Sequence, residues 1–282
     1  MSKFIKIFCC LIIIIAGYYY FFCQLKTERE KFLQSNFVDY TLPSRFIGPI
    51  SLEFKGLASD FLLFKFMTFI GGQTAKINEF DDKYWTYIID TLETITDLDP
   101  WFWDAYLFGE MFLAWQAGKI EAANNLLLKA KKYRPNDYRV PYYLGFNYYY
   151  FLKDNVQAAK YFMEASKLPG CHYYLASLAA RLSVFNFQHQ IGITFLKEML
   201  KGQTDQRIIK EFKLRIATLE FMDFLEHKVS EFQKIHQKLP DSLQELATAG
   251  LVENIPADPY GGKFVLLPNG RVYTTSKMLI QR

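Results

Sequence analysis

The sequence has few of the residues that build metal sites and disulfide frameworks. It holds four cysteines and four histidines among 282 residues. Cys9, Cys10 and Cys23 share one apolar stretch and Cys171 stands alone, a spacing that excludes a zinc site and a disulfide framework. The histidines lack the spacing to cysteines or carboxylates that metal ligation needs. We therefore expect no metal and no cofactor.

Strong charge of either sign is also missing. The 33 Lys and Arg stand against 29 Asp and Glu, which gives a net charge of +4, and no run of basic residues occurs. A nucleic-acid-binding protein usually has a larger or more clustered basic excess, so we expect no nucleic-acid partner. The sequence has no nucleophile elbow, Walker loop or dinucleotide-binding fingerprint. These absences predict a protein that is not an enzyme and has no small-molecule substrate.

Aromatic residues, in contrast, are abundant. The chain has 27 Phe and 19 Tyr, and 51% of its residues are hydrophobic. Such a composition excludes a disordered chain. The length is enough to bury the core of one large domain or two modest ones.

The N-terminus begins with a long apolar run. Residues 4–23 are almost wholly apolar, broken only by Lys6. About 20 apolar residues can cross a bilayer core as a helix, and the tyrosines at 18–20 suit the membrane interface. The alternative is a cleaved secretory signal, but the run ends in YYYFFC without the small residues of a cleavage site. We therefore predict a single-pass signal-anchor.

The orientation of this anchor follows from the flanking charges. Lys3 and Lys6 precede the run, and Lys26, Arg29 and Lys31 follow it, so the positive-inside count is close to a tie. A short basic tail before the first apolar segment usually stays in the cytoplasm. We expect an inner-membrane protein with the bulk of the chain in the periplasm.

The middle of the chain repeats. Pro100, Pro135 and Pro169 are 35 and 34 residues apart, and an apolar helix is predicted ahead of each. Each predicted helix has small or apolar residues at spacings of four and three, which lie on one helical face. A partner helix carries a large residue followed by a small one, as in Leu144-Gly145. The small residues expected where neighbouring helices cross are Gly109, Ala123, Ala130, Gly145, Ala158, Ala165 and Ala179. The alternative is an ordinary helical bundle with chance periodicity.

This pattern resembles the tetratricopeptide repeat (TPR). The family's order of Leu-Gly, an aromatic, Ala, Phe, Ala and Pro over about 34 residues is almost complete in LGFNYYYFLKDNVQAAKYFMEASKLPG. The repeat from Trp101 to Pro135 is good but has two extra residues before Gly118, and the flanking copies are degenerate. The resemblance covers about half of the chain. It implies a right-handed stack of antiparallel helix pairs.

In that fold the first helix of each pair lines a concave groove. The resemblance places these side chains there: Trp103, Tyr106, Glu110, Arg139, Tyr142, Phe146, Tyr149, Tyr150 and Tyr173. The same register adds Leu113 and Ala114. Tyr and Trp dominate interface hot spots, so the groove is predicted to bind a peptide or helix of a partner protein. The alternative is that flanking helices, including residues 57–70, fill the groove.

The C-terminal part differs from the repeats. An amphipathic stripe predicts one long helix from about 205 to 237, which we expect to cap the repeats. A short helix at 242–249 follows, and then a hairpin around Asn269-Gly270.

This end resembles the C-terminal region of the major pseudopilins of type II secretion systems. The match rests on Leu246, Gly250-Leu251, Ile255-Pro256, residues 258–261 and Asn269-Gly270. Pseudopilins bind calcium through an acidic loop, whereas from residue 254 onwards this chain has Asp258 as its one acidic residue, which argues against a calcium site. A prepilin cleavage site is also missing, so the chain is not itself a pilin.

These expectations give a mostly α protein with a membrane helix, a TPR-like solenoid and a small helix plus β-hairpin module. The predicted segments are an anchor at 1–25, a stalk and linker at 26–56, repeats at 57–204, a capping helix at 205–238 and the pseudopilin-like module at 239–282. We predict a scaffold or adaptor for protein–protein interaction in the bacterial envelope, with components of a pilus or secretion system as its partners by analogy. The alternative is an envelope structural or self-assembling protein without a peptide ligand.

Overall fold

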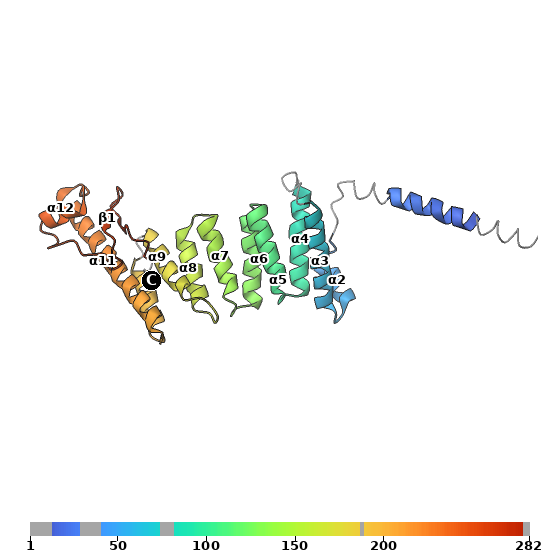
Figure 1. Ribbon diagram of the computed structural model, residues 1–282, viewed down its shortest axis with the longest axis horizontal. Coiled ribbons are helices and arrows are strands. Elements are labelled where there is room, and N and C mark those ends of the chain that lie inside the picture. Colours follow the sequence, from blue (N-terminus) through green and yellow to red (C-terminus); the bar gives the residue numbers. More distant parts are fainter. Residues whose placement is uncertain (1–12, 29–40, 74–81, 187–188, 279–282) are drawn as a thin grey trace, which may run out of the picture. The chain divides into compact units, whose positions relative to one another are not determined.

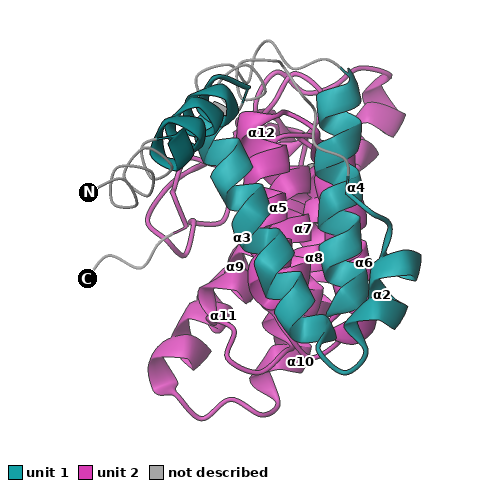
Figure 2. Cartoon of the chain, turned by 90° about the vertical axis from the view of Figure 1, so that its right-hand side faces the viewer, with its two compact units in different colours: residues 1–99 teal, residues 100–282 magenta. Residues whose placement is uncertain are grey.

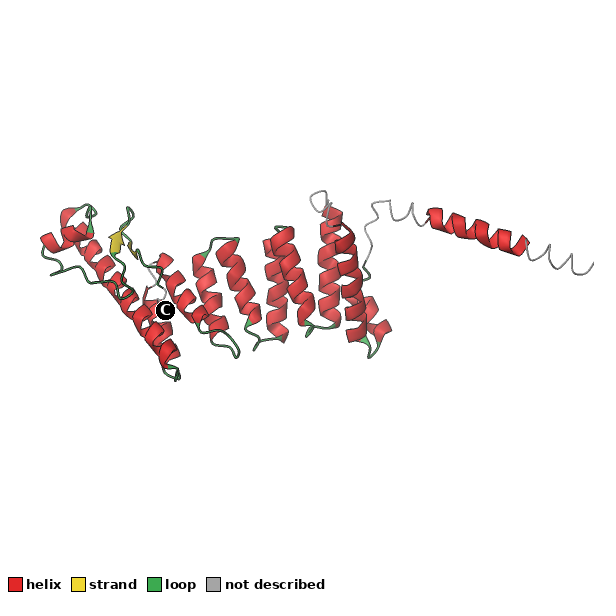
Figure 3. Cartoon of the chain, in the orientation of Figure 1, coloured by secondary structure: helices red, strands yellow, loops and turns green. Residues whose placement is uncertain are grey.

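A computed structural model describes residues 13–28, 41–73, 82–186 and 189–278 (Figure 1). The chain divides into two compact units, residues 1–99 and 100–282, which Figure 2 colours separately. The described residues are mostly helical, and their strands are confined to a short pair near the C-terminus (Figure 3). The predicted class, mostly α with a small C-terminal hairpin, is therefore confirmed.

Helices make up the described part of the first unit. Besides a helix over residues 13–28, they are α2 (Ser44–Ser51), α3 (Lys55–Gln73) and α4 (Asp82–Leu98). α3 and α4 pack along each other. Their contact buries Phe66 and Ile70 from α3 and Ile88 and Ile95 from α4. Ser59 Oγ donates a hydrogen bond of 3.0 Å to the Ile95 carbonyl oxygen, which fixes the two helices in register.

Two boundaries in this unit differ from the predictions. The segment read as a linker contains helix α2 with Pro49 inside it. The segment is held to α4 by a Thr41–Thr91 hydroxyl contact of 2.5 Å and a Ser44–Asp97 hydrogen bond of 2.7 Å. Helix α3 extends past the predicted segment 57–70 and runs through Gly71 and Gly72 to Gln73. Glycine costs a helix interior about 1 kcal/mol, which disfavours a helix without breaking it.

The predicted anchor is covered only in part. Within the described residues, no helix is long and apolar enough to cross a membrane. Residues 4–12 of the predicted anchor lie outside the described part of the chain.

The second unit is a series of helices that pack in chain order. They are α5 (Trp103–Met111), the π-helix η2 (Phe112–Gln116), α6 (Ile120–Tyr133), α7 (Arg139–Tyr150), α8 (Asn155–Ser166), α9 (Tyr174–Leu182), the 3₁₀ turn η3 (Ser183–Asn186), α10 (His189–Leu200) and α11 (Gln206–His236). Each α-helix from α5 to α10 packs against the next one, and Figure 1 shows α5 to α8 side by side. α6 and α8 end just before Pro135 and Pro169, where the prolines stop further helix growth.

The small residues of the repeats lie at the buried faces of these helices. Gly109, Ala123, Ala130, Gly145, Ala158, Ala165 and Ala179 are all buried. Gly145 on α7 shows why size matters there, because a Cβ atom at this position would lie 2.7 Å from Cδ1 of Phe162 on α8. The missing side chain thus lets α8 place a buried aromatic ring directly against the α7 backbone.

Replacing Gly145 by alanine is therefore expected to lower the free energy of unfolding. The new methyl group overpacks a site where the buried Phe162 ring cannot swing away, and overpacking typically costs about 1–3 kcal/mol. Urea unfolding followed by circular dichroism measures the change. Gly202→Ala is the matched control, because nothing lies within 4 Å of a Cβ at that position. Equal stability of the two variants would contradict the packing argument.

The C-terminal segment folds onto α11. It comprises α12 (Leu243–Thr248) and the antiparallel strands β1 (Phe264–Leu266) and β2 (Val272–Thr274), paired through Val265 and Tyr273. α11 is one unbroken helix and contacts both α12 and β2. Apolar side chains from the segment join the core of the second unit, among them Leu246, Phe264 and Val272.

A buried polar cluster ties the hairpin to two helices. Glu226 on α11 accepts hydrogen bonds at Oε1 from Arg271 Nε (2.9 Å) and the Val272 amide (3.0 Å). Its Oε2 lies 2.9 Å from His189 Nε2 on α10. The side chains of Glu226, Arg271 and His189 are all buried. One carboxylate thus joins α10, α11 and β2.

Candidate functional site

Large aromatic rings gather at the surface of the second unit. Trp115 on η2 stacks on Phe146 and Tyr150 of α7, with ring centroids 5.7 and 5.2 Å apart. Phe146 and Tyr150 stack on each other at 5.5 Å, and Phe151 meets Trp115 edge-on at 5.1 Å. Trp115 is 51% and Tyr150 45% exposed. We call Trp115, Phe146, Tyr150 and Phe151 the aromatic cluster.

Trp115 lies on the exposed side of its helix, four residues after the exposed Met111. In η2 the backbone bond from the Ala117 amide to the Phe112 carbonyl oxygen spans five residues instead of four. Leu113 and Ala114, which the repeat register placed in the groove, are buried, whereas Trp115 is open to solvent.

Sequence reasoning therefore missed Trp115. The signal that could have found it was the pair of extra residues before Gly118, which interrupts the repeat register. π-turns inside helices often lie at functional sites, which gives that signal its weight.

The nine side chains predicted to line the groove are distributed over three levels of exposure. Tyr150 and Tyr173 are exposed. Four are half-buried, namely Arg139, Tyr142, Phe146 and Tyr149. Three are buried, namely Trp103, Tyr106 and Glu110. Tyr142, Phe146 and Tyr150 follow one face of α7 at intervals of four residues, so the structure brings these three together with Trp115.

The buried residues of this set lie beneath the start of α7. Trp103 lies under the guanidinium groups of Arg139 and Arg134, at 4.3 and 5.7 Å from their Cζ atoms to the ring centroid, and 6.1 Å from the Tyr143 ring. Such cation–π contacts stabilise a packed indole. The Tyr106 hydroxyl donates to the Pro100 carbonyl oxygen at 3.3 Å.

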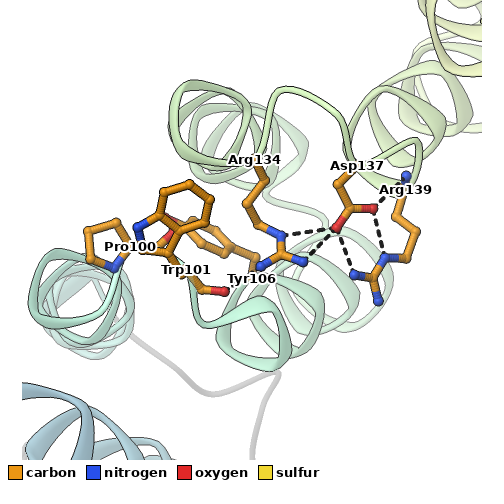
Figure 4. A network of polar contacts seen from close by, with 6 residues as sticks. All are labelled: Pro100, Trp101, Tyr106, Arg134, Asp137 and Arg139. Carbon is orange, nitrogen blue, oxygen red and sulfur yellow. Dashed lines mark hydrogen bonds and ion pairs between the residues drawn. The ribbon is translucent and has the colours of Figure 1, made fainter. Parts of the chain in front are cut away.

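An arginine–aspartate network anchors the start of α7 (Figure 4). Asp137 accepts hydrogen bonds from Nε and Nη2 of Arg134 at 3.0 and 2.8 Å, and from Nε and Nη2 of Arg139 at 2.8 and 2.7 Å. Arg134 also donates to the Trp101 carbonyl oxygen. Partial burial acts to raise the pKa of Asp137, but the hydrogen bonds from Arg139 and Arg134 outweigh it and lower the pKa to about 2. The carboxylate therefore stays charged and holds the α6–α7 loop fixed.

A second polar group lies deeper under α7. Glu110 on α5 is fully buried, and neither of its carboxyl oxygens has a hydrogen-bond partner. Asn147 on α7 donates to Asn124 Oδ1 at 3.0 Å, while its own Oδ1 is also unsatisfied. Burial raises the pKa of Glu110 to about 7, although the Asn147 side chain, which is near Glu110 but outside hydrogen-bond geometry, offsets part of the rise. Burial therefore favours the neutral carboxyl, which, unlike the carboxylate, can donate a hydrogen bond.

Two depressions flank the beginning of α7. One of about 650 Å³ lies between Trp101 and Pro169 at the α6–α7 loop. A smaller one of about 240 Å³ is lined by Tyr142, Cys171 and His172. Burial raises the pKa of the Cys171 thiol, which donates weakly to the His172 carbonyl oxygen at 3.8 Å. A nucleophilic cysteine needs a lowered pKa, so Cys171 is not set up as one.

Metal-binding chemistry has no support in the described residues. No three His, Cys, Asp or Glu side chains of this part of the chain are grouped so that they could hold a metal ion.

Comparisons with known proteins assign no family. No protein-family model matches the chain, and no curated protein or solved structure matches it at a significant level.

Proposed function

We propose that this chain is a scaffold that binds a protein partner through the aromatic cluster on η2 and α7. The observation that carries the proposal is the stack of Trp115, Phe146 and Tyr150, held on packed helices with two of its rings half open to solvent. Rings that are already stacked lose little conformational freedom on binding. Trp and Tyr are also the side chains most enriched at interface hot spots.

The chemistry of the cluster selects an apolar segment of the partner. Flat rings offer a surface for aliphatic or aromatic side chains of a peptide or helix. Lys153, whose Nζ lies 5.0 Å from the centre of the Tyr150 ring, adds a polar edge that can pair with a carboxylate or a carbonyl group. Both features suit an amphipathic segment with an apolar face.

The remaining parts of the proposal rest on resemblance and on composition. The TPR-like succession of helix pairs is a common framework for peptide binding. The apolar run at 4–23 would tether the scaffold to the inner membrane, with the bulk of the chain in the periplasm. The pseudopilin-like end suggests, by analogy, partners among the components of a pilus or a secretion system.

Replacing Trp115 and Tyr150 together by alanine is expected to reduce partner capture from detergent-solubilised native membranes at least tenfold. Loss of hot-spot side chains typically costs about 2 kcal/mol or more, which corresponds to that change or a larger one. Quantitative affinity purification of the tagged full chain measures it. Phe224→Ala on α11 is the matched control, because it removes another exposed aromatic ring at a distant position.

Two results would count against this proposal. Unchanged recovery of all partners by the double variant would remove the cluster as the docking site. Recovery of only a second, differently tagged copy of the chain, lost in the double variant, would favour the self-assembling alternative.

A further inference from the structure

The first unit exposes an apolar surface that the proposed scaffold function does not use. Along α3, Leu57, Phe61, Phe64 and Met67 recur at spacings of four and three residues and are exposed, Phe64 by 70%. We call these four residues the α3 outer face. The opposite side of α3 buries Phe66 and other residues against α4. Helix α3 is therefore apolar on both sides. This is expected of a helix whose outer side is also buried, by a surface other than α4.

The turn before α3 extends this surface. Ile50 in the last turn of α2, and Leu52 and Phe54 between α2 and α3, are exposed by 75%, 71% and 68%. Leu52 adopts a positive φ of 49°, a backbone conformation that a leucine takes at a cost. We call these three residues the α2–α3 corner. Three large apolar side chains exposed this close together are unfavourable in water, so we expect another apolar surface to contact this corner.

We propose that the α3 outer face and the α2–α3 corner lie in the interface of a lipid bilayer. Leu and Phe predominate on this surface, and they are the side chains that interfacial helices insert at the boundary of headgroups and acyl chains. Cationic side chains border it, as interfacial helices require, at Arg45, Lys55 and Lys65. Two exposed carboxylates interrupt the surface, Glu53 at the corner and Asp60 on the same side of α3 as Phe64, so apolar burial rather than charge is the main attraction.

The length of the chain is consistent with this contact. Between the helix that ends at residue 28 and the next described residue, Thr41, the chain can extend at most about 45 Å. A bilayer that holds the run at 4–23 is therefore always within reach of α3. This step rests on the proposed membrane anchor, whereas the apolar surface itself is independent of it.

The test uses the full chain with its native cysteines replaced and one new cysteine carrying an environment-sensitive fluorophore. Phe64→Cys places the probe on the α3 outer face, and Asp90→Cys places it at an exposed position of α4. The chain is reconstituted into vesicles of phosphatidylethanolamine and phosphatidylglycerol, with a phosphatidylcholine arm. We expect spin-labelled lipids to quench the probe at 64 at least threefold more than the probe at 90, and iodide to show the reverse order. The preference should persist in phosphatidylcholine.

The outcomes separate this inference from the scaffold proposal. Adding Leu57→Asp and Phe61→Asp should abolish lipid quenching at 64. A probe at 64 that iodide reaches as easily as the probe at 90, in chains that float with the vesicles, overturns the lipid contact and leaves the anchor intact. Shielding from iodide without lipid quenching also overturns it and indicates a protein on this face. Chains that do not float with vesicles overturn both the lipid contact and the anchor, whereas the partner-capture result is independent of every arm.

Discussion

Replacing Glu226 by alanine is expected to lower the free energy of unfolding of the second unit by about 3–5 kcal/mol. That is the usual loss when one partner of a buried ion pair is removed, because the remaining charge stays buried without its counter-ion. Here Arg271 loses the acceptor of its Nε hydrogen bond, and the Val272 amide and His189 lose their contacts with the carboxylate as well. The contacts between β2, α10 and α11 then depend mainly on apolar packing.

The measurement is urea unfolding of the full chain, with Glu226→Gln and Glu253→Ala beside it. Glutamine keeps an oxygen that accepts hydrogen bonds, so Glu226→Gln should lower the free energy of unfolding less than Glu226→Ala. Glu253 is exposed in the loop after α12, so its removal should change little. A loss below about 1 kcal/mol for Glu226→Ala would show that the cluster does not hold the hairpin.

The stabilisation by Glu226 should also depend on pH, on the acid side. Burial acts to raise the pKa of Glu226, but hydrogen bonds from His189 and Arg271 outweigh it, so the pKa in the folded state lies below the ordinary value. A lowered pKa means that the folded state binds the proton more weakly than the unfolded state. The contribution is complete above the unfolded pKa of 4.5 and is lost as the pH falls through the folded pKa.

In contrast to Glu226→Ala, Glu110→Gln is expected to raise the free energy of unfolding, by about 3 kcal/mol at pH 8. The wild-type carboxyl is buried without a hydrogen-bond partner, and burial raises its pKa from the ordinary value of 4.5 to about 7. Each tenfold change in a protonation equilibrium is worth about 1.4 kcal/mol, so ionisation of the buried group costs roughly 3 kcal/mol. Glutamine carries no charge, and its amide can donate to the unsatisfied Asn147 Oδ1.

The sign of the pH dependence distinguishes this group from Glu226. Because the folded pKa of Glu110 is raised, its favourable contribution is complete below the unfolded pKa and is lost as the pH rises towards about 7. Above that pH the free energy of unfolding of the wild type stays at its lower value. Urea unfolding at pH 5 and pH 8 should therefore show a gain from Glu110→Gln that is larger at pH 8. Glu121→Gln, at an exposed position of α6, is the control, and a loss of stability at both pH values for Glu110→Gln would contradict the argument.

The sequence was most informative where a local signal sets a boundary. Pro135 and Pro169 predicted the ends of α6 and α8, and Asn269-Gly270 predicted the hairpin turn. These signals act over a few residues, so no knowledge of the tertiary fold is needed to read them. Pro49 misled for the same reason. A proline suggests a break, yet the Ser44–Asp97 contact, 53 residues apart, helps to hold α2 as a helix.

The candidate site was harder to predict because it depends on contacts distant in the chain. A repeat register assigns Trp103 to a groove face, but it cannot show that Arg134, Arg139 and Tyr143 pack against its ring. The Glu226 cluster joins residues 37 and 45 positions apart, and no motif marks such a pairing. Trp115 lies outside the positions that the repeat register assigns to the groove, so the register could not single it out.

The hydrogen bond of η2 that spans five residues adds one residue to the helix just before the chain turns towards α6. A residue gained in this way rotates everything after it by about 100°. Loss of one residue from this turn would therefore change the direction in which the chain enters α6, and with it the way α6 packs on α5.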